Sequence, residues 1–214
     1  MTSMRQAIRP DWLTVAAPRL AIAGVVMPFL FLGFSTILAV TRPGYDLVSD
    51  PISRLGQDGG TNSLVWQLGG FLAAAALELG YAGALLAVFG RSLVTALMVA
   101  IAALLALSAA APLGSTLTQV HMIAGLLLFA CFALIPLAAW LEFRRRPEWA
   151  DMSRGSLVVG VVLVVWFLLE SNFEASQLGF WQRAFLVVAL GWQVVVALRV
   201  RRLARRRLEL AQAT

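Results

Sequence analysis

The serine Ser53 and the histidine His121 are the residues of this chain best suited to nucleophilic chemistry. Ser53 lies in a polar segment, and His121, the only histidine, stands near the start of an apolar segment. A histidine can accept the proton of a serine hydroxyl, and a carboxylate such as Asp50 or Glu170 can orient that histidine. No nucleophile-elbow pattern surrounds Ser53. Hydrolysis of a lipid ester by Ser53 and His121 is therefore an alternative hypothesis, with Asp50 as a further catalytic candidate.

A larger set of polar residues flanks the long apolar segments on what we expect to be one side of a membrane. It contains carboxylates, hydroxyl groups and arginines, which together could hold the polar part of a ligand. The leading hypothesis is non-enzymatic: this face binds a lipid or small amphiphile, or docks a partner membrane protein. The predicted ligand-binding residues are Tyr45, Asp50, Ser53, Arg54, His121, Glu170, Gln182 and Arg183.

Glu78 is an intramembrane acid, because it lies in the middle of an apolar segment. A charge at the centre of a bilayer costs from about 2.5 to more than 10 kcal/mol. We therefore expect a neutral carboxyl group that is hydrogen-bonded to a helix carbonyl or to a partner subunit, or one that faces a polar cavity. A small proton-coupled transporter that uses Glu78 is the second alternative. A metal site is not expected, since the chain has one histidine and one cysteine, and no cofactor is predicted.

The segments that must position these residues are strongly apolar. The chain has 214 residues, of which 60% are hydrophobic and 13% charged, whereas soluble domains have about 45–50% apolar and about 25% charged residues. A span of about 20 apolar residues crosses a bilayer as a helix. The sequence predicts an all-α integral membrane protein, a bundle of six transmembrane helices. The expected spans are about 18–40, 65–89, 93–111, 119–141, 156–173 and 179–200.

These spans make one domain over residues 18–200, between an N-terminal segment at 1–17 and a basic tail at 201–214. The longest loop is 41–62, expected on the outer side. With the N-terminus inside, fourteen of the seventeen arginines fall on the cytoplasmic side and Arg42, Arg54 and Arg183 fall outside. The positive-inside rule then predicts a multi-pass protein of the cell (inner) membrane with both termini cytoplasmic. Boundary aromatic belts are predicted at Trp66, Trp181 and Tyr45 outside and at Trp12, Trp140 and Trp149 inside.

The formal net charge of +6 is typical of proteins that bind a polyanion. Because the arginines stand at the ends of apolar segments, without interleaved aromatic residues, anionic lipid headgroups explain them better than nucleic acid does. The expected partners are therefore membrane lipids, together with a membrane-protein partner or further copies of this chain. No nucleic-acid partner is predicted.

The loop and the later polar residues carry a family resemblance. The chain has Arg42-Pro43-Gly44-Tyr45, then Asp50-Pro51-Ile52-Ser53-Arg54-Leu55-Gly56, with Pro112, His121 and Gly179-x-x-Gln182-Arg183 further on. In these motifs it resembles the bacterial and archaeal membrane family called domain of unknown function 998, over about residues 21–200. Such families usually have an acidic residue where this chain has Arg54. The resemblance implies a six-helix membrane fold, and it implies no activity and no catalytic residues.

Overall fold

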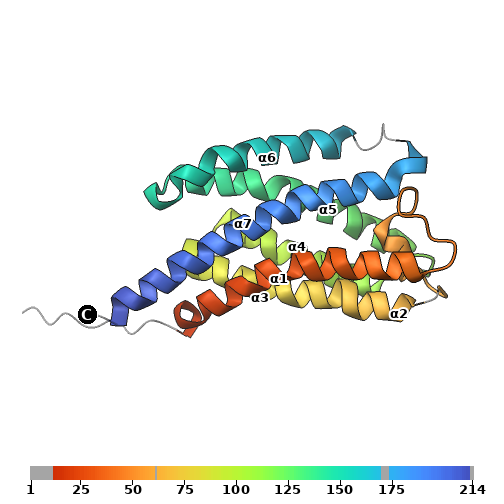
Figure 1. Cartoon of the computed structure of the whole chain (residues 1–214), viewed down its shortest axis with the longest axis horizontal. Coiled ribbons are helices and arrows are strands. Elements are labelled where there is room, and N and C mark those ends of the chain that lie inside the picture. The colour runs from red at the N-terminus through yellow and green to blue at the C-terminus, as the bar shows by residue number, and fades with distance from the viewer. Residues whose placement is uncertain (1–11, 61, 170–173, 213–214) are drawn as a thin grey trace, which may run out of the picture.

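Six long helices run roughly along one common direction (Figure 1) in the computed structural model, which describes residues 12–60, 62–169 and 174–212. No strand occurs among these described residues. The long elements are α1 (Trp12–Thr41), α2 to α3 (Ser63–Phe89), α4 (Leu93–Ala110), α5 (Thr118–Phe143), α6 (Ala150–Leu169) and α7 (Leu178–Gln212). Each of the six spans is long and apolar enough to cross a membrane. The chain is thus a multi-pass membrane protein, as the sequence predicts.

The second span is one helix in three sections, with a π-helical turn between two α-helical parts. It starts as α2 (Ser63–Trp66), continues as a π-helical turn, η2 (Gln67–Leu72), and becomes α3 (Ala73–Phe89). A π-helical turn inserts an extra residue into the helix and so rotates the side chains that follow. Here the turn carries Phe71, whose ring lies edge-on against the ring of His121 with centroids 5.9 Å apart.

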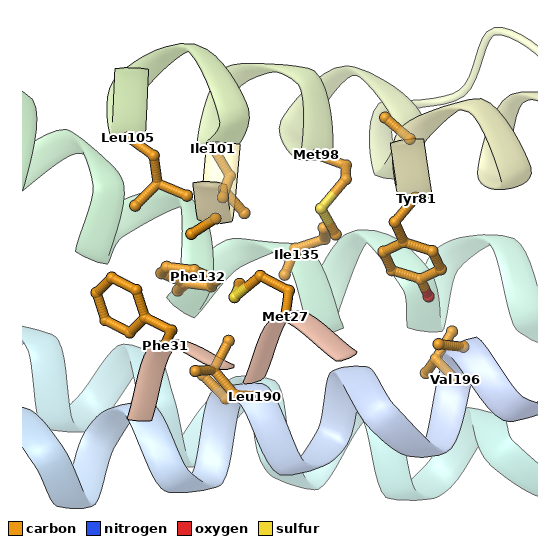
Figure 2. Packing of buried hydrophobic residues seen from close by; sticks show 14 of the residues in the cluster. Met27, Phe31, Tyr81, Met98, Ile101, Leu105, Phe132, Ile135, Leu190 and Val196 are labelled. Carbon is orange, nitrogen blue, oxygen red and sulfur yellow. The ribbon is translucent and has the colours of Figure 1, made fainter. Parts of the chain in front are cut away.

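The helices pack around a shared apolar interior. α1 lies against α3 and α7, α4 lies between α3 and α5, and α6 packs on α5. Figure 2 shows Met27 and Phe31 of α1 reaching the same interior as Met98 of α4 and Leu190 of α7. Without a hydrophobic driving force between helices in lipid, such close packing supplies the attraction through van der Waals contacts.

The closest approach of α1 and α3 requires a glycine. A Cβ atom at Gly24 would lie 2.6 Å from Cγ of Tyr81, whose ring is buried against the α1 backbone. Since Cβ atoms essentially never approach that closely, any larger residue at position 24 would push the two helices apart. Gly24 therefore sets the spacing of this helix pair.

Three helices extend beyond the predicted spans by six residues or more. α1 begins at Trp12 rather than at residue 18, α6 begins at Ala150 rather than at 156, and α7 continues to Gln212 rather than ending at 200. The predicted spans followed apolar residues alone, and a helix can continue past the apolar region because its backbone hydrogen bonds are internal. Residues 201–212 of the predicted tail are thus the last part of α7. Residues 170–173, where we expected the fifth span to continue, lie outside the described residues.

The two ends of the bundle are distinct. One end, called the loop end below, carries residues 42–60, 111–117 and 174–177; the other, called the terminal end, carries the start of α1 and the end of α7 (Figure 1). At the terminal end Trp149 is completely buried and stacks on Phe143, with centroids 4.5 Å apart. At the loop end Trp66 is completely buried beside Phe31. The prediction that Trp66 and Trp149 belong to boundary belts is therefore wrong.

Candidate functional site

The loop that follows α1 is fastened to the start of α7 by one arginine. Nη1 of Arg183 donates to the carbonyl oxygens of Leu47 at 2.9 Å, Asp50 at 3.0 Å and Gly179 at 2.9 Å. Nη2 of the same side chain donates to the Tyr45 hydroxyl at 2.7 Å. Charge-assisted hydrogen bonds of this kind are the stronger ones in proteins. The guanidinium group of Arg183 thus joins the first turn of α7 to two carbonyls and one side chain of the loop.

Tyr45 extends this network into the loop. Its hydroxyl accepts from Arg183 and lies within donor distance of the carbonyl oxygens of Pro51, at 2.9 Å, and Asp50, at 3.1 Å. Burial raises the pKa of this hydroxyl above its ordinary value of 10.0, although the neighbouring Arg183 acts in the opposite direction. The side chain therefore acts as a neutral link between Arg183 and the start of the short 3₁₀ helix η1 (Ile52–Gly56).

Asp50 is occupied within the loop. Its Oδ2 accepts from the backbone N–H of Asp46 at 2.9 Å, and its Oδ1 forms an ion pair with Arg54. Asp46 in turn accepts from the N–H groups of Ser49, at 2.9 Å, and Val48, at 2.7 Å, and these bonds lower its pKa below 3.8. Asp50 and Arg54 therefore shape the loop and do not line the pocket described below.

Gly179 and Gln182 complete the attachment of the loop to α7. A Cβ atom at Gly179 would overlap the carbonyl oxygen of Asp50 and would lie 2.8 Å from that of Leu47. Oε1 of Gln182 accepts from the backbone N–H of Ile52 at 3.2 Å. The Gly179-x-x-Gln182-Arg183 motif thus places a bare backbone, an acceptor and a donor on one helical turn, all facing the loop.

A pocket of about 460 Å³ lies beneath this loop, between the ends of the helices. Its volume falls in the range of about 300–1,000 Å³ that is usual for ligand pockets. Four lining residues are polar: Ser53, Ser108, His121 and Gln182. The other lining residues are Phe31, Pro51, Ile52, Phe71, Leu113, Met122, Gly125, Leu126, Leu128, Phe129, Phe167 and Leu178.

His121 is held in one tautomer by a backbone group. Its Nδ1 lies 2.8 Å from the carbonyl oxygen of Ala111, and a carbonyl oxygen can only accept. In the neutral ring the proton must therefore be on Nδ1, and Nε2 is left as an acceptor. None of the described residues forms a hydrogen bond with Nε2, and the residue lines the pocket.

The structure divides the predicted site residues into two groups. Ser53, His121 and Gln182 line the pocket, whereas Tyr45, Asp50, Arg54 and Arg183 contact one another and the loop backbone. Glu170 lies outside the described residues. Asp50 does not orient His121, because the carbonyl of Ala111 occupies that position.

Sequence reasoning missed Ala111, Ser108, Gly125 and Phe71. Pro112 offered a signal for the first of these, since a proline ends the helix and leaves a carbonyl without its intrahelical donor. Ser108, Gly125 and Phe71 carry no such signal, because nothing in their type distinguishes them from other residues of apolar spans.

Glu78 lies apart from the pocket. It is completely buried, its Oε1 accepts from Nε2 of Gln193 at 2.9 Å, and its Oε2 has no partner among the described residues. Nε2 of Gln193 also lies 3.4 Å from the carbonyl oxygen of Gly24. The carboxyl group thus joins α3 to α7 and, through Gln193, to α1.

The family model described as "Protein of unknown function (DUF998)" matches residues 25–199 of the chain. The match covers the six spans from the middle of α1 to the middle of α7 and includes every motif discussed above. No curated protein and no solved structure matches the chain.

Proposed function

The chain belongs to the family described as protein of unknown function (DUF998), and within this six-helix fold we propose that the pocket beneath the loop binds a lipid or small amphiphile. The observation that supports the proposal is the lining of the pocket: twelve of sixteen residues are apolar or glycine, and four small polar groups stand among them. Apolar pockets with a few fixed polar groups are typical of sites for amphiphilic ligands.

The position of the pocket in the bundle also favours a ligand that arrives from the membrane. Met122 and Leu126 line the pocket, and yet their side chains are 56% and 59% exposed. The pocket therefore opens on the side of α5 rather than only under the loop. In a bilayer that side faces acyl chains, so an apolar tail could enter without crossing water.

A glycine in the pocket wall allows a direct test. Gly125 lines the pocket and an added Cβ atom there would meet nothing within 4 Å, so the side chain of Gly125→Leu can start at the pocket wall without a clash. We expect this variant to reduce photo-crosslinking of a lipid with a diazirine in its oleoyl chain by about tenfold, which corresponds to about 1.4 kcal/mol of binding free energy. Mass spectrometry should locate the wild-type crosslinks on the peptide that contains residues 118–143.

Gly33→Leu is the matched control. Gly33 lies eight residues from the loop end of α1, Gly125 lies seven from the loop end of α5, and neither added Cβ would meet an atom within 4 Å. Gly33 does not line the pocket. Equal crosslinking of the two variants would show that lipid contacts the outside of the bundle alone and would refute the proposal.

We also propose the orientation that the arginines favour, with both termini cytoplasmic in the cell membrane and the loop end on the other side. Arg91, Arg144, Arg145 and Arg146 lie in or beside the connections of the terminal end, together with the arginines of residues 199–207. Basic residues near helix ends remain on the cytoplasmic side under the positive-inside rule. The pocket would then open near the outer leaflet.

A second candidate function is hydrolysis of a lipid ester, because Ser53 and His121 line the same pocket. In this reaction Oγ of Ser53 attacks the ester carbonyl while Nε2 of His121 takes its proton and passes it to the leaving alcohol. Water, deprotonated by the same Nε2, then hydrolyses the acyl-serine, which releases the fatty acid and restores the Ser53 hydroxyl. The test is the release of oleate from monooleoylglycerol by purified protein. Release that Ser53→Ala leaves unchanged would exclude Ser53 as the nucleophile.

A further inference from the structure

We infer that the pocket selects amphiphiles whose polar group is uncharged, such as an alcohol or an ester of glycerol, over those with a charged headgroup. The inference rests on the proposed function, since it concerns the ligand of the same pocket. It depends on two observations: the described residues of the pocket wall include no charged side chain, and backbone groups fix the direction of two of its polar side chains.

Arginine, aspartate and glutamate are all missing from the described residues that line the pocket. The charged residues of the adjoining loop attachment are not among the lining residues either: Arg183 donates to loop carbonyls, and Asp50 forms an ion pair with Arg54. A phosphate or ammonium group that entered the pocket would lose its hydration without gaining a counter-charge. Such a transfer is strongly unfavourable in an apolar environment.

The backbone fixes the direction of two polar side chains in the pocket. In the neutral ring of His121 the carbonyl of Ala111 holds the proton on Nδ1, so Nε2 is an acceptor. The N–H of Ile52 can only donate, so the oxygen of Gln182 must face it and the NH₂ group of Gln182 remains as a donor. None of the described residues accepts from that NH₂ group, and Ser53 likewise forms no hydrogen bond with them.

With His121 in its neutral form, the described lining residues therefore offer an acceptor at His121, an amide donor at Gln182 and the hydroxyl of Ser53, whereas the hydroxyl of Ser108 donates to the carbonyl of Leu104. A hydroxyl group of a ligand could donate to Nε2 of His121, and an ester or ether oxygen could accept from Gln182. Glycerol with a single acyl or alkyl chain has both kinds of group and an apolar tail. Long-chain alcohols and acylglycerols are accordingly the chemical class that fits.

The test compares two ether lipids that differ only in a phosphate group, 1-O-oleylglycerol and 1-O-oleylglycerol-3-phosphate. Ether linkages prevent hydrolysis, so binding is measured without any reaction. Each lipid competes with the diazirine-labelled oleoyl lipid for crosslinking to the full chain in a neutral detergent. We expect the uncharged lipid to compete at a concentration at least about tenfold lower than that of the phosphate.

Two variants test the polar groups. His121→Asn retains an amide donor near the position of Nδ1 and removes the acceptor at Nε2. Gln182→Glu keeps an acceptor for Ile52 but replaces the donor with a negative charge. Both should weaken competition by 1-O-oleylglycerol several-fold with unchanged protein folding. If either fails to fold, Ser53→Ala replaces it, because that change removes a hydroxyl group with no partner among the described residues.

The results separate this inference from the proposed function. A preference for the uncharged lipid that Gly125→Leu abolishes and Gly33→Leu preserves supports both. Equal or stronger competition by the phosphate, still abolished by Gly125→Leu, would overturn the inference and leave the binding site in place. If neither lipid competes in a way that depends on Gly125, both the inference and the proposed function are overturned.

Discussion

At the scale of single residues, the functional differences at the loop end come from what each polar side chain is bonded to. Arg183 and Tyr45 have the charge and the hydroxyl group that a ligand site needs, but their bonds go to loop carbonyls. His121 and Gln182 each use one polar atom, Nδ1 and Oε1 respectively, in a hydrogen bond with a backbone group. Their other side-chain nitrogen atoms form no hydrogen bond with the described residues. Binding capacity therefore follows from unused hydrogen-bonding positions rather than from residue type.

We expect the loop to lose stability at high pH, because the pKa of the Tyr45 hydroxyl is raised in the folded protein. Because burial raises its pKa above 10.0, the folded chain holds this proton more tightly than the unfolded chain does. The contribution to stability is fully present below pH 10.0 and is lost as the pH rises through the folded-state pKa. The chain has two tyrosines, so phenolate absorbance in a Tyr81→Phe variant reports Tyr45 alone. Its midpoint should lie above 10.0 and should fall on unfolding.

Tyr45→Phe provides the control for this titration. It removes both the proton and the hydrogen bond from Arg183, so the alkaline change in loop protection should disappear with it. Hydrogen exchange of residues 46–56 as a function of pH measures that protection. A phenolate midpoint for Tyr45 at or below 10.0 in the folded protein would contradict the prediction.

At the scale of elements, the first turn of α7 is the structure on which the loop depends. Gly179 lets the backbone of the loop lie directly on the helix, and Phe180 donates its N–H to the carbonyl of Val48 at 2.8 Å. Gln182 and Arg183 then fix Ile52 and Asp50 at the edge of the pocket. The roof of the pocket and the start of the sixth span are thus one unit.

Gly179→Ala should detach the loop from α7. The added Cβ would overlap the carbonyl oxygen of Asp50, and the loop would have to move away from Arg183 and Gln182. We expect a loss of about 2 kcal/mol in the free energy of unfolding, as is usual for steric overlap with buried backbone. Thermal unfolding in detergent and hydrogen exchange of residues 46–56 measure the two effects.

Gly191→Ala is the control on the same helix. An added Cβ there meets nothing within 4 Å, and alanine is the better helix former by up to about 1 kcal/mol. This variant should be equal to the wild type or more stable, with unchanged exchange in the loop. Similar behaviour of the two variants would mean that contact between the loop and Gly179 does not hold the loop in place.

The contrast between these contacts and the spans explains what the sequence could predict. Six long apolar helices follow from the number of apolar residues, because helix length and bilayer thickness are linked. Three of the residues predicted to form a site at the loop end, Ser53, His121 and Gln182, do line the pocket. The partners of Arg183 and His121 were not, since both are bonded to carbonyl oxygens, which every residue has. The burial of Trp66 depends on tertiary packing with Phe31, which no local pattern encodes.

At the scale of the whole molecule, α7 links the two ends of the bundle. Its 35 residues give a helix about 52 Å long, whereas the apolar core of a bilayer is about 30 Å thick. The part of α7 from residue 199 onward carries six of the seven arginines of this helix. Two of these arginines contact the connection between α5 and α6. Nη2 of Arg199 donates to the carbonyl of Glu148 at 2.7 Å, and Arg207 lies 3.7 Å from the carboxylate of Glu148. The terminal end is thus a basic helical extension with acidic contacts on one side.

The proposed orientation predicts different reactivity of cysteines at the two ends. Cys131, the single cysteine, is first replaced by alanine, and one new cysteine is introduced as Asp58→Cys at the loop end or as Glu209→Cys near the end of α7. Both side chains are exposed, so burial does not limit their reaction. A membrane-impermeant maleimide should label Asp58→Cys on intact cells and should label Glu209→Cys only after permeabilisation. Because the arginine bias that favours this orientation is large, the reverse pattern would mean that the positive-inside rule fails for this chain, and the pocket would then open toward the cytoplasmic leaflet.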